Sequence, residues 1–193
     1  MADAGVHLRR IHMARIELLT KPYPPEFAAV AEKITAPGAE PLALFTLLGK
    51  SMRALEKFMG GSMAGRGPLG MRDKEIVIDR TVAKCGNSYE WGLHIKHFAA
   101  KAELTDAQVK SLALGHGDDG SWNTAEATLI ATVDALLANK KLSDAEYARL
   151  SASFDESQRF EIVQLVGFYH SVSLLCGAFA LPNEAGTATI PTA

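Results

Sequence analysis

The second half of the chain repeats one short pattern that marks the start of an α-helix. A side chain that can accept a backbone hydrogen bond is followed three residues later by Glu or Gln, which is the pattern of a capping box. The pattern occurs at Thr105–Gln108, Asn123–Glu126, Ser143–Glu146 and Asp155–Gln158. Each occurrence precedes a run with helical character, so we predict helices over 106–114, 124–139, 144–153 and 156–180.

The first half of the chain is also predicted to be helical. The prolines of residues 22–25 exclude a helix there, and Pro25 suits the first turn of a helix over 26–34. Leucines and methionines at helical spacing predict a helix over 42–59, and two more helices are expected over 72–84 and 88–102. No alternating pattern of useful length predicts a strand. The expected fold class is therefore all-α, a bundle of about eight helices.

Composition narrows the classes of function. The 193 residues are 48% apolar and carry 20 basic against 22 acidic side chains, which fits one globular domain and leaves no basic block for nucleic-acid binding. The N-terminal segment lacks the apolar run of a signal peptide. Cys85 and Cys176 form neither a CxxC pair nor a disulfide framework, which fits a reducing, cytoplasmic location.

The longest apolar stretch, residues 162–181, is long enough to cross a bilayer. Polar residues such as Gln164 and His170 interrupt it, so we predict a buried helix and no membrane association.

Residues 75–101 gather titratable side chains on the faces of two successive predicted helices. Glu90 and His94 are four residues apart and share one helical face, and His97 extends the same stripe. Trp91 and Phe98 lie on the neighbouring, apolar face. The stretch therefore combines an acid and two imidazoles on one helix face with a neighbouring apolar face that is expected to pack into the core.

This stretch resembles the carboxymuconolactone decarboxylase family, which includes the alkylhydroperoxidase D-like proteins. The matching segments are Arg72–Ile78, Gly86–Trp91, His94 and the helix restart at Leu104–Asp106, and similarity continues at Asp155–Gln158 and Val166–His170. The resemblance covers roughly residues 40–180. It implies an alkylhydroperoxidase D-like fold, a small-molecule substrate, chemistry without a redox cofactor, and a homotrimer or homohexamer.

We expect the chain to be divided into three parts. Residues 1–40 form an N-terminal extension that is expected to wrap a neighbouring subunit, residues 41–182 form the helical domain, and residues 183–193 form a flexible tail.

The peroxidase branch of the family uses a Glu, a Cys-x-x-Cys pair and a His four residues after the second Cys. On this sequence the Glu falls on Glu75, the cysteines on Asn87 and Glu90, and the His on His94. Both sulfur atoms are missing, and Cys85 does not replace them. What the resemblance implies for this chain is therefore acid–base catalysis by His94, Glu90 and Glu75.

Several of these assignments have simpler alternatives. Glu90 fits a capping role at a helix start, and Glu75 in a first turn is favourable for the helix dipole alone. A metal held by Glu90, His94 and His97 ranks below acid–base chemistry. The candidates for substrate binding are Trp91, which fits a core role equally well, His97, Tyr169 and His170.

The leading function is therefore an enzyme of the carboxymuconolactone decarboxylase type that acts on a small organic acid or lactone. One alternative is a peroxidase that depends on Cys85, and another is an oligomeric protein that binds a ligand without catalysis.

Overall fold

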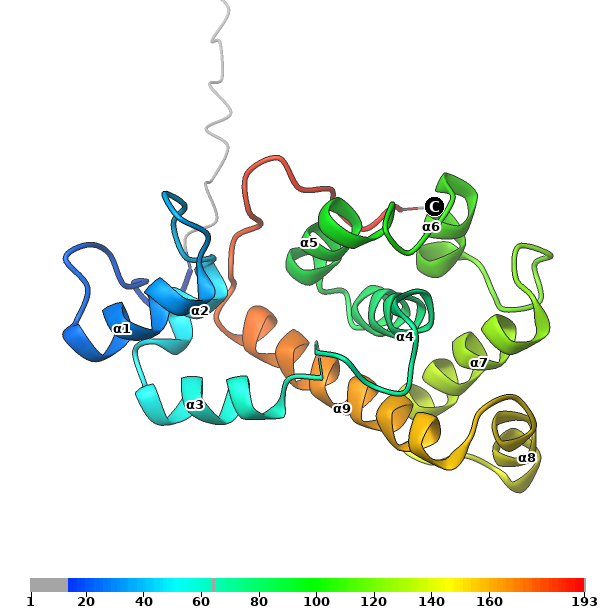
Figure 1. Cartoon of the computed structure of the whole chain (residues 1–193). Helices are drawn as coiled ribbons and strands as arrows, with labels where there is room; N and C mark the ends of the chain where they lie inside the picture. The colour runs from blue at the N-terminus through cyan, green and yellow to red at the C-terminus, as the bar shows by residue number, and fades with distance from the viewer. Residues whose placement is uncertain (1–13, 64, 193) are drawn as a thin grey trace, which may run out of the picture.

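Helix α4 (Met71–Lys84) lies at the centre of the fold, with helices around it on several sides (Figure 1). The structure is a computed structural model, and it describes residues 14–63 and 65–192. The other helices of this part of the chain are α1 (Pro25–Ile34), α2 (Ala43–Leu48), α3 (Met52–Gly61), α5 (Ser88–Phe98), α6 (Asp106–Leu114), α7 (Thr124–Asn139), α8 (Asp144–Ser153) and α9 (Glu156–Ala178). The described residues form no strand, so the all-α class is confirmed.

The four predicted capping boxes are all present. At the start of α6, α7, α8 and α9 the capping side chain accepts from the backbone three residues on, and the Glu or Gln there accepts from the capping residue. Because these paired bonds occupy otherwise free N–H groups, they fix where each helix begins. The bounds predicted for 106–114, 124–139 and 144–153 are confirmed.

The single helix predicted over 42–59 is wrong, because the chain breaks between α2 and α3. Ser51 adopts an extended conformation, and its hydroxyl accepts from the backbone N–H of Ala54, so a new helix starts there. A Cβ atom at Gly49 would collide with the ring of Phe27, so this turn packs directly against α1. The described residues therefore hold nine helices, and Met59 near the end of α3 is 40% exposed.

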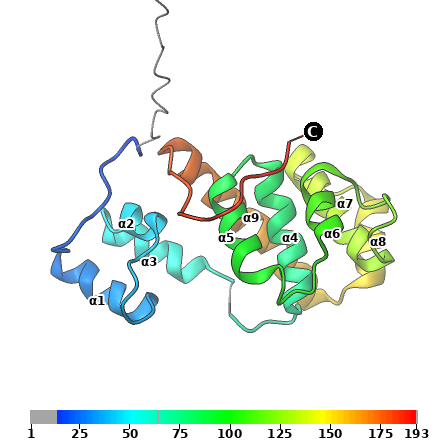
Figure 2. The same ribbon diagram turned by 90° about the horizontal axis from the view of Figure 1, so that it is seen from above.

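Two apolar clusters make up the core. The larger one surrounds α4, whose Ile76 and Val77 pack with buried side chains of α5, α6, α7 and α9. The smaller cluster joins α1, α2 and α3 to the C-terminal half of α9 through residues such as Phe27 and Val172. Seen from above, α1–α3 form a separate layer beside the helices that enclose α4 (Figure 2).

Helix α9 is long and apolar enough to cross a membrane by length and composition alone. Its Ile162, Leu165 and Val166 instead belong to the core cluster around α4. Burial of these side chains within the protein explains the apolar run, as the sequence predicted.

Charged side chains of α4 tie it to its neighbours. Arg80 is fully buried and makes two bonds to Asp134 of α7, at 2.6 and 2.8 Å. Arg80 also donates to the carbonyl oxygens of Leu112 and Gly115, which are left free at the end of α6. One guanidinium group therefore fixes α6 and α7 against α4.

The C-terminal segment after α9 runs along α5 (Figure 2). The carboxylate of Glu184 accepts from the hydroxyl of Tyr89 at 2.9 Å and from the backbone N–H of Ala43 at 2.7 Å. Gly92 leaves no room for a Cβ because Thr187 and Ala188 lie against it. The flexibility of residues 183–193 stays a prediction, and so does the wrapping of a neighbouring subunit by residues 1–40.

We expect Arg80→Met to lower the free energy of unfolding by about 1–3 kcal/mol, because it leaves the carbonyl oxygens at the end of α6 without their buried donor and the partly exposed Asp134 unpaired. Urea denaturation followed by circular dichroism measures the change. Arg53→Met on the exposed side of α3 is the control. An equal loss of unfolding free energy in both variants would show that the contacts of Arg80 make no specific contribution to stability.

Candidate functional site

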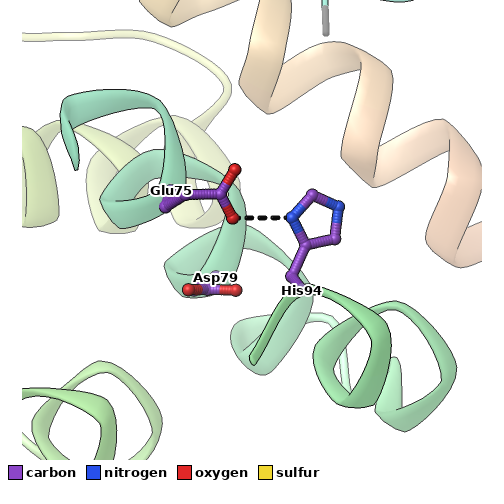
Figure 3. A group of neighbouring side chains, drawn as sticks. All are labelled: Glu75, Asp79 and His94. Atoms are coloured by element: carbon purple, nitrogen blue, oxygen red, sulfur yellow. Dashed lines mark hydrogen bonds and ion pairs between the residues drawn. The ribbon is translucent and has the colours of Figure 1, made fainter. Parts of the chain in front are cut away.

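The centre of the site is a hydrogen bond between α4 and α5. The Nδ1 atom of His94 lies 2.7 Å from Oε2 of Glu75, and both side chains are buried (Figure 3). Glu75 is in the second turn of α4 and His94 is midway along α5, and the short Cys85–Asn87 turn brings the two helices together. The pairing that the sequence placed on two successive helices is thus present in the structure.

The carboxylate of Glu90 lies on the other side of the imidazole, 3.6 Å from Nε2 of His94. At the start of α5 the side chain of Asn87 accepts from the backbone N–H of Glu90 at 3.2 Å. The N–H of Asn87 donates to the carbonyl oxygen of Val82, so it is not bonded by Glu90 as a capping box requires. The carboxylate of Glu90 is therefore near the imidazole and does not serve as a helix cap.

A third carboxylate, Asp79, completes a buried acidic surrounding for His94. Asp79 follows Glu75 by one turn of α4, is 0% exposed, and has no hydrogen-bond partner on either oxygen among the described residues (Figure 3). Burial raises the pKa of Asp79 well above its usual value; the charge of His94 opposes this shift and that of Glu75 adds to it. A neutral, protonated Asp79 is the form that such a site favours.

The pKa values of His94 and Glu90 are shifted as well. Burial lowers the pKa of His94, but the hydrogen bond with Glu75 and the charges of Glu75, Asp79 and Glu90 outweigh it, so the net pKa is raised. Burial raises the pKa of Glu90, and the charge of His94 offsets part of that shift. The imidazole therefore holds its proton more tightly than in solution, because carboxylates surround it.

A cavity of about 530 Å³ opens beside this pair. Its walls are formed by Gly65, Arg66, Gly67, Leu69, Met71, Lys74, Glu75, Ile78, His94, Phe98 and Tyr169. The ring of Tyr169 meets the imidazole edge to face with ring centroids 5.2 Å apart, and the Phe98 ring lies 5.3 Å from it. The reactive groups therefore lie in a largely apolar cavity that accommodates a small organic molecule.

The loop that closes one side of this cavity is anchored by an ion pair. Lys74 lies 2.8 Å from the carboxylate of Glu161 on α9 and donates to the carbonyl oxygen of Gly65 at 2.7 Å. Glu161 also accepts from the backbone N–H of Leu69, and any Cβ at Gly67 would collide with it. The loop is thus bound to α4 and α9 at several points, and Arg66 stands on it at the exposed edge of the cavity.

The other residues that the sequence proposed for binding fall in different places. Tyr169 lines the cavity as expected, whereas Trp91 is 1% exposed and lies in the core around α4. His97 is exposed, because the three-residue step from His94 carries it off the buried face. His170 is half-buried and does not line the cavity, because its neighbour Tyr169 takes the inward position on α9.

Sequence reasoning missed Asp79, Lys74 and Arg66. Asp79 had a usable signal, since it is four residues from Glu75 and shares its helical face. Arg66 had none, because the path of a glycine-rich loop is set by tertiary contacts.

The metal ligands considered from the sequence, Glu90, His94 and His97, do not form a group, because His97 is exposed and the other two side chains are buried. The described residues instead place ligand atoms of Glu75, Asp79 and His94 within 4.8 Å of one another. These three side chains could hold a cation, although Nδ1 of His94 is already bonded to Glu75.

Comparison with known sequences points to one family. Residues 49–134 match the model of the carboxymuconolactone decarboxylase family. The match includes all four residues of the site: Glu75, Asp79, Glu90 and His94. No curated protein sequence matches significantly.

Solved structures agree on the fold. An uncharacterized peroxidase-related protein from Silicibacter sp. TM1040 is 17% identical with a TM-score of 0.69, covering 89% of this chain and 92% of the other. The alkylhydroperoxidase AhpD core of a peroxidase-related protein from Ralstonia eutropha JMP134 is 10% identical with the same TM-score, covering 89% and 93%. The debrominase Bmp8 is 19% identical with a TM-score of 0.64, covering 87% and 91%. These likenesses confirm the alkylhydroperoxidase D-like fold.

We expect the stability of the protein to fall as the pH rises from 5 to 8, and Asp79→Asn to reduce that fall. The raised pKa of Asp79 means that the native state keeps a proton that the unfolded chain releases above its own pKa of about 3.9. This contribution to stability is complete below that value and is lost as the pH approaches the native pKa. His94, with its raised pKa, contributes in the same direction above about pH 6.5.

Urea unfolding of the wild type and of Asp79→Asn at pH 5 and pH 8 measures this effect, with a change of at most about 1.4 kcal/mol per pH unit from one group. Asp118→Asn, in an exposed loop, is the control and should follow the wild type. Equal pH dependence in all three proteins would contradict a protonated Asp79.

Proposed function

We propose that this protein is an enzyme of the carboxymuconolactone decarboxylase type that moves a proton to or from a small organic acid or lactone. The observation that carries the proposal is the 2.7 Å bond between His94 and Glu75 in the wall of a cavity of about 530 Å³. A cytoplasmic location and the absence of a redox cofactor belong to the same proposal.

The imidazole has the properties of a proton-transfer group. Glu75 holds Nδ1, so Nε2 is the nitrogen that can exchange a proton with a bound molecule or with Glu90. Since the surrounding carboxylates raise the pKa of His94, its protonated form is available near neutral pH as a general acid. Glu75 is the partner that orients the ring and stabilises its positive charge.

Decarboxylation fits these groups as follows. The bond between the carboxyl carbon and the substrate carbon breaks, carbon dioxide leaves, and the electron pair remains on the substrate as an enolate. The Nε2–H of protonated His94 donates the proton that forms the new C–H bond. Apolar walls such as Leu69, Ile78 and Phe98 favour this step, because they remove water from the leaving carboxylate. The neutral imidazole could instead accept a proton during lactone isomerisation.

The peroxidase alternative has support from the names of similar structures, two of which are peroxidase-related proteins. In this chain the two positions of the redox cysteines hold Asn87 and Glu90. Cys85 does not line the cavity, and burial raises the pKa of its thiol, with a hydrogen bond to Ser173 as a smaller opposing effect. A raised pKa reduces the reactive thiolate form, so these features favour acid–base chemistry.

Turnover can be tested with a panel of butenolide and γ-lactone carboxylic acids in deuterated water, followed by proton NMR for loss of the carboxyl group or uptake of deuterium at carbon. On any compound that reacts, we expect His94→Ala to lower the rate by about 10²–10⁴-fold, because it removes the proton donor. Glu75→Gln should reduce kcat less, since the imidazole remains.

The control is His116→Gln, which changes an exposed imidazole outside the cavity and should leave the rate unchanged. Wild-type turnover by His94→Ala would reject the proposal. Consumption of cumene hydroperoxide that requires a thiol reductant and Cys85 would favour the peroxidase, and binding without any turnover would favour the non-catalytic alternative.

We also propose that the protein forms a homotrimer or homohexamer. Phe160 and Leu174 on the outer side of α9 are 67% and 63% exposed, and Val163 between them is 45% exposed. Large apolar side chains that are exposed along one helix of a single chain are typical of a surface that becomes buried between subunits.

We expect Phe160→Glu to shift the protein to a smaller assembly in light scattering after size exclusion, because the charge would be buried in the contact. Ser157→Glu, on an exposed part of the same helix, is the control. A wild-type protein that runs as a monomer would reject this assembly.

A further inference from the structure

The cavity beside His94 is lined by charged side chains of both signs. At its floor the imidazole is bonded to Glu75, with Glu90 and the buried Asp79 behind it. At its exposed edge stands Arg66, on the loop between α3 and α4. An anion entering this cavity is attracted to the guanidinium group at the edge.

Arg66 differs from the other cations nearby because no carboxylate in the described part of the chain pairs with it. Lys74 is paired with Glu161 and bonded to Gly65, and Arg72 is paired with Glu126 at 2.6 Å. Within residues 14–63 and 65–192, no carboxylate lies within ion-pair distance of Arg66. Its hydrogen-bond donors are therefore available to a bound molecule.

The loop that carries Arg66 is held in place by contacts on both sides of it. Gly65 is bonded to Lys74, Gly67 lies against Glu161, and the carbonyl oxygen of Pro68 accepts from Gln158 at 3.3 Å. A fixed loop loses little conformational entropy when a ligand binds, so a single cation on it can contribute to recognition.

Much of the remaining cavity wall is apolar. Leu69, Met71, Ile78, Phe98 and Tyr169 line the cavity together with the guanidinium group and the imidazole. A ligand that matches this lining has an anionic group for Arg66, an apolar ring or chain for the apolar walls, and a reacting atom that reaches His94.

We propose that Arg66 is the residue that selects an anionic substrate and sets its orientation, with the anionic group at the cavity edge and the reacting atom toward His94. The group bound by Arg66 is thus separate from the group that reacts, so a substrate that loses a carboxyl group at His94 carries a second anionic group. This inference rests on the proposed function for the reacting atom. The recognition of an anion by Arg66 stands independently of catalysis.

The test compares two probes of nearly the same shape, 4-fluorobenzoate and 4-fluorobenzamide, in fluorine NMR titrations of the full chain. We expect the wild type to bind the anion roughly two- to fivefold more tightly than the amide, the ratio given by one partly solvated ion pair. Arg66→Gln should bring this ratio to about one and leave the affinity for the amide unchanged. Arg66→Lys should keep part of the preference, and 0.5 M salt should reduce it.

Arg53→Gln, an exposed arginine on α3 that does not line the cavity, is the matched control and should keep the wild-type ratio. An unchanged ratio in Arg66→Gln, no preference in the wild type, or no binding of either probe would overturn the inference. The preference should persist in His94→Ala, because the imidazole does not bind the anion. Normal turnover by His94→Ala would therefore reject the proposed function without affecting the role of Arg66.

Discussion

Burial of charged side chains on α4 is the constraint on which the rest of this structure depends. A helix at the centre of a bundle is usually apolar, yet Lys74, Glu75, Asp79 and Arg80 of α4 are all buried. A buried charge is tolerated where it is paired or neutralised. Three of these residues have partners on α9, α5 and α7, so satisfying α4 also fixes the positions of the helices around it.

The same constraint creates the site. Partners on other helices satisfy Lys74 and Arg80, whereas Glu75 and Asp79 face the imidazole of His94 and share it with Glu90. Three carboxylates around one imidazole leave a negative excess that protons must compensate. This cluster of carboxylates and imidazole is suited to proton transfer, because small changes in its surroundings alter which side chain holds the proton.

The replacement at Glu90 changes what the family arrangement can do. Where the peroxidase branch has its second cysteine, this chain places a carboxylate 3.6 Å from the imidazole. A thiol near a histidine can give up electrons as a thiolate, whereas a carboxylate can only exchange a proton or a hydrogen bond. The Glu75–His94 bond is compatible with both chemistries, so the same fold accommodates either one.

The sequence by itself determined where most of the helices begin, and it located the Glu75–His94 pair of the site. Capping boxes fixed the starts of α6 to α9, because the signal lies within four consecutive residues. The spacing of Glu90 and His94, together with the family pattern, located the Glu75–His94 pair, because that pair lies on adjacent helices joined by a short turn.

Only the tertiary structure decided what depends on contacts between distant segments. The turn between α2 and α3 packs against Phe27 of α1, and the path of the Arg66 loop follows from Glu161 on α9, 95 positions further along the chain. Helical spacing put His97 and His94 on one stripe, but the packing of α5 buried His94 alone. Local sequence patterns reflect hydrogen bonds between residues that are close in the chain. Burial depends on which surfaces of the whole chain pack together, so it cannot be read from a local pattern.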